Sequence, residues 1–225
     1  MMHLLWRCLT FSFLFLLACN GADKKASSSQ QPSKLYLDYK VTAQEGAENV
    51  VVLLQFRKHG PDDKGIALEN GSQVTLDGEV AIADSAREAG VYYEIQRPLA
   101  TFAGKHLIVF TDDAGNTYEQ AFEFNPLTLQ GLPPVINRKD LTLLLGAGQE
   151  EGKVQVLVTD TSFETADIND EYSIKDNHIL IQQEALQKVT NGPITLEVHR
   201  EQEEKLPNGR LLISYAVKRE LEIKD

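Results

Sequence analysis

The chain has 225 residues, of which 33 are acidic and 22 are basic, so its formal net charge at pH 7 is −11. An acidic chain is poorly suited to nucleic acid and to anionic lipid surfaces, because both attract basic proteins. The composition therefore predicts no nucleic-acid partner. The length suits one large domain or two small ones.

A short apolar segment stands near the N-terminus. It runs from Cys8 to Ala18, and Arg7 precedes it. A membrane-spanning helix needs about 20 apolar residues, whereas the apolar part of a secretory signal peptide needs about 7–15. Residues 1–18 are therefore predicted to be a signal peptide. Its removal leaves 21 basic and 33 acidic residues, a net charge of −12.

The predicted signal peptide ends in Leu16-Leu17-Ala18-Cys19. This string resembles the lipobox of bacterial lipoproteins, in which the cysteine thiol is lipidated and the chain is cut just before it. The resemblance implies that Cys19 is the lipidation site and the first mature residue, carrying two or three acyl chains, which anchor a protein stably. The alternatives are an ordinary signal peptide with an incidental cysteine, or a buried apolar segment. Because Cys8 leaves with the signal peptide, the mature chain would have no internal disulfide.

A polar segment, residues 19–34, follows the predicted cleavage site and is rich in Ser, Gln, Gly, Ala and Lys. Such a composition buries too little apolar surface to fold, so we expect a flexible tether that reaches on the order of 20 Å. In the lipoproteins that the chain resembles, a residue such as Asn20 in place of aspartate favours the outer membrane. The predicted location is the bacterial cell envelope, with a lipid anchor in the outer membrane.

Beyond the tether, apolar and polar residues alternate with a period of two. In the first such segment Leu37, Tyr39 and Val41 share one face, while Asp38 and Lys40 share the other. Alternation of this kind, rich in β-branched and aromatic residues, is typical of half-buried antiparallel strands. The segments are residues 35–42, 49–57, 91–96, 117–124, 153–160, 178–181, 194–201 and 210–223.

Residues 106–124 are predicted to be two strands joined through Asp112-Asp113-Ala114-Gly115-Asn116. Gly115 accepts positive φ, and the Asp and Asn side chains bond their own backbone, so the string favours a hairpin. It resembles the final hairpin of bacterial immunoglobulin-like domains, and this resemblance implies an immunoglobulin-like β-sandwich. The resemblance covers this hairpin alone. The tryptophan and cysteine pair of antibody domains is absent, since the single tryptophan is Trp6, in the predicted signal peptide.

Residues 125–135 contain three prolines and a glycine, as a short connection between domains does. The sequence therefore predicts an all-β fold of two antiparallel immunoglobulin-like β-sandwich domains in tandem, residues 35–129 and 130–225. Each domain is expected to have its own core. A short helical crossover is predicted within residues 182–189 of the second domain.

Few residues suggest catalysis or metal binding. Four histidines follow the predicted signal peptide, and none stands at a helical metal-ligand spacing with another ligand: His59, His106, His178 and His199. The chain has no G-x-S-x-G, phosphate-loop or H-E-x-x-H motif. The sequence therefore predicts no catalytic residue, no cofactor and no metal site.

Three oxygen-rich or charged segments require an interpretation. Residues 160–172 carry several carboxylates, and calcium takes six to eight oxygen ligands. The segment lacks the central glycine and distal glutamate of an EF-hand loop, so a solvated loop is favoured over a calcium site. Asp112 and Asp113 are expected to form a turn. Residues 199–210 are expected to form a long, charged, solvated hairpin tip.

Three classes of function remain compatible with the sequence. The first, which we favour, is a non-catalytic binding or adhesion module, anchored to the membrane through its N-terminal lipid, that binds a protein or a glycan. The second is a structural accessory subunit of an envelope assembly. The third is a hydrolytic enzyme, which no motif in the sequence supports. Fold class does not decide among them, because β-sandwiches host all three.

Overall fold

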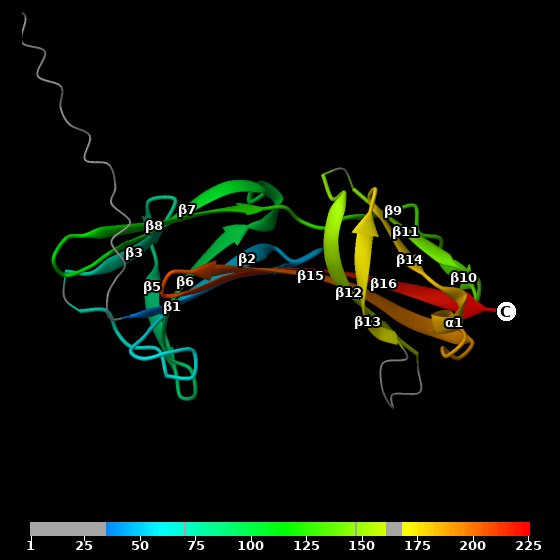
Figure 1. Cartoon of the computed structure of the whole chain (residues 1–225), viewed down its shortest axis with the longest axis horizontal. Coiled ribbons are helices and arrows are strands. Elements are labelled where there is room, and N and C mark those ends of the chain that lie inside the picture. Colours follow the sequence, from blue (N-terminus) through cyan, green and yellow to red (C-terminus); the bar gives the residue numbers. More distant parts are fainter. Residues whose placement is uncertain (1–34, 70, 147, 161–167) are drawn as a thin grey trace, which may run out of the picture.

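The computed structural model describes residues 35–69, 71–146, 148–160 and 168–225. We refer to residues 35–124 as the N-terminal half and to residues 125–225 as the C-terminal half. No helix within the described residues is long and apolar enough to cross a membrane. Figure 1 shows the two halves lying end to end along the longest axis of the molecule.

Almost all of the regular structure is β-strand. The N-terminal half contains β1 (Tyr36–Gln44), β2 (Asn49–Arg57), β3 (Gln73–Leu76), β4 (Glu79–Val80), β5 (Ile82–Ala86), β6 (Gly90–Pro98), η1 (Leu99–Thr101), β7 (Gly104–Thr111) and β8 (Thr117–Phe124). The C-terminal half contains β9 (Leu129–Gln130), β10 (Val135–Asn137), β11 (Leu141–Leu145), β12 (Glu151–Thr159), β13 (Ile168–Lys175), β14 (His178–Ile181), α1 (Gln183–Leu186), β15 (Gly192–Leu206) and β16 (Gly209–Lys224). The predicted all-β fold class and the helical turn within residues 182–189 are confirmed.

The strands form two sheets. One has the order β5-β6-β2-β1-β16-β15-β12-β13-β14-β11-β9, with β10 also paired to β16, and the other has the order β4-β3-β7-β8. In the N-terminal half the two sheets pack face to face, and the rings of Phe56 on β2 and Phe110 on β7 lie 4.7 Å apart. This is the layered arrangement of a β-sandwich.

Within the described ranges all strand pairs are antiparallel except two, which differ from the prediction of purely antiparallel sheets. β16 pairs in parallel with β1 and with β10. The β1 pair joins residues 37–44 to residues 209–216, so it crosses from one half of the chain to the other. The reason is the length of the β15–β16 hairpin, which continues past the C-terminal half into the N-terminal half (orange to red in Figure 1). We call residues 200–216 the hairpin tip.

Buried apolar side chains form one continuous cluster that includes residues of both halves. The expectation of two separate cores is therefore wrong. Tyr215 of the hairpin tip is buried and its ring lies 6.0 Å from that of Phe124, the last residue of β8. Leu206 and Leu211, on either side of the hairpin turn, are also buried. The predicted boundary at residues 129–130 stays a prediction, but the core and the sheet both continue across it.

Candidate functional site

The joint between the halves is built along β1 and the hairpin tip. At one end of the pairing the amide of Leu37 donates to the carbonyl of Asn208 at 2.7 Å, and at the other the amide of Glu45 donates to the carbonyl of Ala216 at 2.8 Å. Gly209 has φ +153°, and a Cβ there would lie 2.0 Å from the carbonyl oxygen of Leu37. Only glycine allows the two backbones to approach this closely.

A buried carboxylate lies at the outer end of the joint. Asp38 is only 1% exposed, although the sequence places it on the polar face of β1. Arg57 of β2 donates through Nη2 to its Oδ2 at 2.7 Å, and Arg210 of the hairpin tip donates through Nε to its Oδ1 at 2.9 Å. The ammonium group of Lys40 lies 3.9 Å from Oδ2. Asp38 therefore links three strands, one of which comes from the C-terminal half.

The electrostatic balance at Asp38 favours the ionised form. Burial by itself raises the pKa of this carboxyl group. The hydrogen bond from Arg210 and the positive charges of the three basic neighbours outweigh burial, so the pKa lies below its ordinary value of 3.8. The other end of the joint has a related contact, in which Nη2 of Arg219 donates to Oε1 of Glu45 at 2.9 Å. Charged contacts thus stand at both ends of the β1–β16 pairing, at Asp38 within β1 and at Glu45 just after it.

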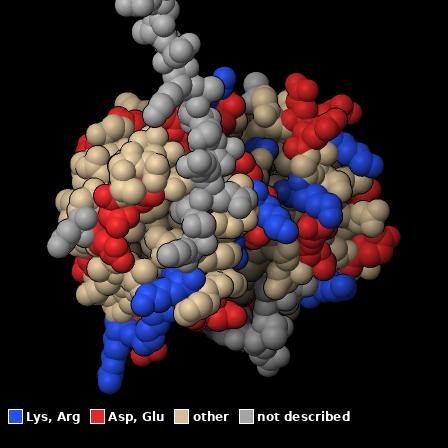
Figure 2. Space-filling view, turned by 60° about the vertical axis from the view of Figure 1, so that its left-hand side comes forward, with Lys and Arg blue, Asp and Glu red and all other residues tan. Residues whose placement is uncertain are grey.

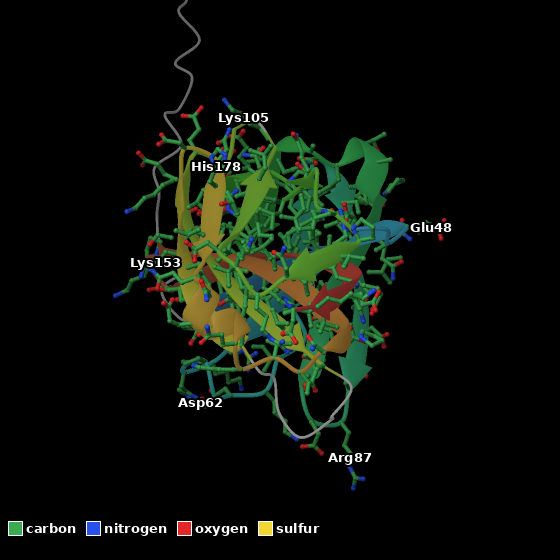
Figure 3. All side chains as sticks on the ribbon, turned by 90° about the vertical axis from the view of Figure 1, so that its right-hand side faces the viewer. Glu48, Asp62, Arg87, Lys105, Lys153 and His178 are labelled. Carbon is green, nitrogen blue, oxygen red and sulfur yellow. The ribbon has the colours of Figure 1, made fainter. Side chains whose placement is uncertain are left out.

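A second feature is an open groove on the outer face of the C-terminal half. It has a volume of about 580 Å³ and is lined by side chains of β12, β13 and β15. Alternation along each strand sends these side chains outward, while Val154, Val156 and Val158 of β12 point into the core. Figure 3 views this half from its end and shows Lys153 and His178 on the same side of it.

The groove offers hydrogen-bond donors and acceptors over a partly apolar floor. Gln155 donates through Nε2 to Oδ1 of Asn169 at 2.5 Å, and Lys153 pairs with Glu171 at 2.5 Å. Leu157 lies in the lining and is partly buried. Such a surface suits a polar ligand, a peptide or a glycan, that exchanges hydrogen bonds with amide, carboxylate and ammonium groups.

The structure places the four predicted histidines in separate environments. His199 on β15 lines the groove, and its Nε2 lies 3.1 Å from Oε2 of Glu197. His106 on β7 is held between the carboxylate of Asp77 at 2.7 Å and the carbonyl of Phe102 at 2.6 Å. The remaining two contact nearby turn residues: His59 lies 2.9 Å from Asp63, and His178 lies 2.6 Å from the carbonyl of Asp176. The structure does not bring them together.

The other predicted site residues lie partly outside the described ranges. Cys19 and the signal and tether residues are outside them, as are residues 161–167 of the acidic segment. At its start, Oδ2 of Asp160 accepts a hydrogen bond from the amide of Thr190 at 3.2 Å. Its last residues belong to β13 and not to a loop, which corrects that part of the interpretation. Among the described residues, no group of three or more His, Cys, Asp or Glu side chains is arranged to hold a metal ion.

Two other predicted segments have the expected structure. Asp112 forms the β7–β8 turn, where its Oδ1 accepts from the amide of Asn116 at 2.8 Å. Residues 199–210 form the predicted charged hairpin, whose turn at residues 207–208 joins β15 to β16. The expectation that this tip is solvated is wrong in part, because Leu206 is buried and Arg210 donates to Asp38. Figure 2 brings the N-terminal half forward and shows acidic and basic side chains in alternating groups.

Asp38 and the groove are the features that the sequence did not single out. Asp38 is one aspartate in a strand of alternating polarity, and no local pattern shows that two arginines cover it. The groove residues are ordinary polar side chains, and their proximity depends on the register of β12 with β13 and β15.

Comparisons with known proteins do not assign the chain to a family. No family model matches it, and no curated protein matches it. Among solved structures, it is similar to the tandem Ig repeats of Dlar, with 11% identity over 85% of this chain and 97% of that chain and a TM-score of 0.24. It is also similar to DIP-gamma IG1+IG2, with 10% identity over 81% of this chain and 94% of that chain and a TM-score of 0.24. At these TM-scores the similarities support no conclusion about what this chain binds.

Proposed function

We propose that the protein is a non-catalytic binding module of the bacterial envelope, anchored through a lipid on Cys19, which presents the groove of its C-terminal half to a protein or a glycan. The observation that carries this proposal is the groove itself, whose polar lining comes from three adjacent strands of the half that does not carry the tether. β1 begins at the outer end of the N-terminal half, directly beside the hairpin turn. The C-terminus lies at the other end of the molecule (Figure 1).

The β15–β16 hairpin supports a role as a stiff spacer. β16 has 16 residues, and at about 3.3 Å per residue it spans roughly 50 Å. Because this strand pairs with β1, β10 and β15, bending between the halves would break backbone hydrogen bonds or the ion pairs at Asp38. A chain tethered at residue 34 would therefore hold its C-terminal half away from the membrane.

The groove supports a ligand with its own hydrogen-bonding groups. Polar side chains from three adjacent strands form its walls, and Leu157 supplies an apolar contact at its floor. Single surface contacts of this kind are individually weak, so affinity would come from several acting together.

Photo-crosslinking in cells tests the proposal. A photoreactive amino acid is placed at Gln155 or Asn169 in the groove and, as a matched control, at the exposed Glu119 on β8 of the N-terminal half. We expect discrete adducts from the two groove positions and none from Glu119. Equal labelling at all three positions, or none at the groove, would contradict the proposed binding face.

The anchor is tested separately with Cys19→Ser. Wild type should incorporate a fatty-acid analogue and fractionate with the membrane. Any serine variant from which the signal peptide has been removed should carry no label and should not fractionate with the membrane. Continued labelling of the processed variant would place the anchor elsewhere. Protease treatment of intact cells then separates an outward-facing adhesion module from a periplasmic accessory subunit, because only the first is digested.

A further inference from the structure

A second cavity lies at the outer end of the N-terminal half, whereas the groove lies on the C-terminal half. It has a volume of about 350 Å³. It is formed where the two sheets of the sandwich diverge, between the β7–β8 turn and the connection from β2 to β3. Leu35, the first described residue, also lines it.

The floor of this cavity is apolar and partly aromatic. The rings of Phe110 and Tyr118 stack 5.6 Å apart with an interplanar angle of 22°. Phe110 is buried, and Leu35, Ile66 and Leu68 are partly buried against the core. The connection is held in place because the amide of Leu68 donates to the hydroxyl of Tyr93 at 2.8 Å. The partly buried aliphatic side chains and the Tyr118 ring therefore give the cavity an apolar lining against which an aliphatic chain can pack.

The rim of the cavity is acidic. Glu69, Asp112 and Asp113 line it, and none of the three forms an ion pair within the part of the chain that the structure describes. Asp112 is instead fixed by neutral donors: Nδ2 of Asn116 at 2.9 Å and the hydroxyl of Tyr118 at 3.0 Å. The hydrogen bonds from Asn116 are the main cause that lowers the pKa of Asp112, so this carboxyl group is ionised at neutral pH.

An apolar lining beside carboxylates that have no ion-pair partner among the described residues selects for one kind of ligand. Removing an apolar body from water against the lining favours its binding. The acidic rim attracts a positive charge and repels a negative one. We propose that this cavity binds an organic cation with an extended apolar body, the chemistry of a lysine side chain. This site lies on a different half from the groove, so the inference goes beyond the function proposed above.

Methyl NMR of the full-length protein in a non-ionic detergent tests this inference. The probe is pentylammonium, whose chain reproduces a lysine side chain, and pentan-1-ol is its neutral counterpart. We expect pentylammonium to shift the methyl resonances of Leu35, Ile66 and Leu68, to bind more weakly at high salt, and to bind more tightly than the alcohol.

Variants of the rim show whether the carboxylates recognise the charge. Glu69→Gln combined with Asp113→Asn should weaken pentylammonium binding by roughly tenfold, since each exposed ion pair contributes modestly. Asp62→Asn is the matched control, because this exposed residue lies outside the cavity and projects from the molecule in Figure 3. The inference is overturned if the methyl groups do not shift, if the alcohol binds equally well, or if the double variant and the control behave alike.

Discussion

The two halves of this protein reach a similar β-architecture by different routes. The C-terminal half builds its part of the sheet from its own strands, β9 to β16. In the larger sheet the N-terminal half supplies β5, β6, β2 and β1. The next two strands after β1 are β16 and β15, which come from the other end of the chain. Similar strands can therefore belong to a unit that is complete by itself or to one that is completed from elsewhere.

Removing the C-terminal half, and the hairpin tip with it, should have the largest effect. A fragment of residues 35–129 lacks the β16 partner of β1 and the buried side chains of Leu206, Leu211 and Tyr215. Burying three such side chains contributes about 5–9 kcal/mol, comparable with the total stability of a typical domain. We expect the fragment to lack a cooperative thermal transition and dispersed amide resonances.

A cut in the connection is the matched experiment. Limited proteolysis near Gln130 leaves every strand pair across the joint in place, so the two pieces should elute together under native conditions. Separation of the pieces, or a stably folded fragment of residues 35–129, would show that the N-terminal half does not depend on the hairpin tip.

Asp38→Ala should have the next largest effect. It leaves the guanidinium groups of Arg57 and Arg210 without their carboxylate, and breaking a buried pair by removing one partner costs about 3–5 kcal/mol. Denaturant unfolding of the variant and of wild type measures this loss. A loss below about 1 kcal/mol, the value of an exposed ion pair, would rule out Asp38 as a link between the halves.

The same residue predicts a pH dependence. Because the pKa of Asp38 in the folded state lies below its ordinary value of 3.8, its stabilising contribution is complete above that pH and is lost as the pH falls through the lower folded-state value. Asp38→Asn should therefore flatten the decline in unfolding free energy below about pH 4. Asp62→Asn, at an exposed position, serves as the control and should leave the decline nearly unchanged.

Gly209→Ala should have a smaller effect that isolates the close approach of β1 to β16. The new Cβ would meet the carbonyl of Leu37, and alanine is also strained at the positive φ of this position. Together we expect these effects to lower the free energy of unfolding by roughly 2–4 kcal/mol. Gly46→Ala is the control, because Gly46 has φ +80° but no atom within 4 Å of the added Cβ. Equal melting temperatures for the two variants would mean that the backbones separate without cost.

Alternation in the sequence predicted the strands well where one face is apolar. The alternation within residues 49–57 puts Val50, Val52, Leu54 and Phe56 on one face of β2, and all four are buried. β13 was predicted in part as a loop because its outward residues are acidic and only Ile168 and Ile174 of this strand are buried. A strand with so few buried positions gives too weak a period to recognise.

Long-range pairing and the candidate sites could not be predicted in the same way. Alternation shows which side chains point inward, but it does not show which strand lies alongside. The hydrophobic pattern of residues 210–223 is interrupted only at Arg219, three residues beyond Ala216, where the neighbour of β16 ceases to be β1. A single polar residue of this kind does not show which strand lies alongside. Asp38 and the polar groove both depend on such neighbours, and so both were missed.

The pairing of β1 with β16 also has a consequence for the timing of folding. Asp38 and Arg210 are 172 residues apart in sequence, and contacts between such distant residues form slowly. At 5–20 residues per second, synthesis of the intervening chain takes roughly 9–34 s. During that interval one edge of β1 lacks its native partner and is open to pairing with other chains. The newly made N-terminal half is therefore vulnerable to aggregation until the last part of the chain arrives.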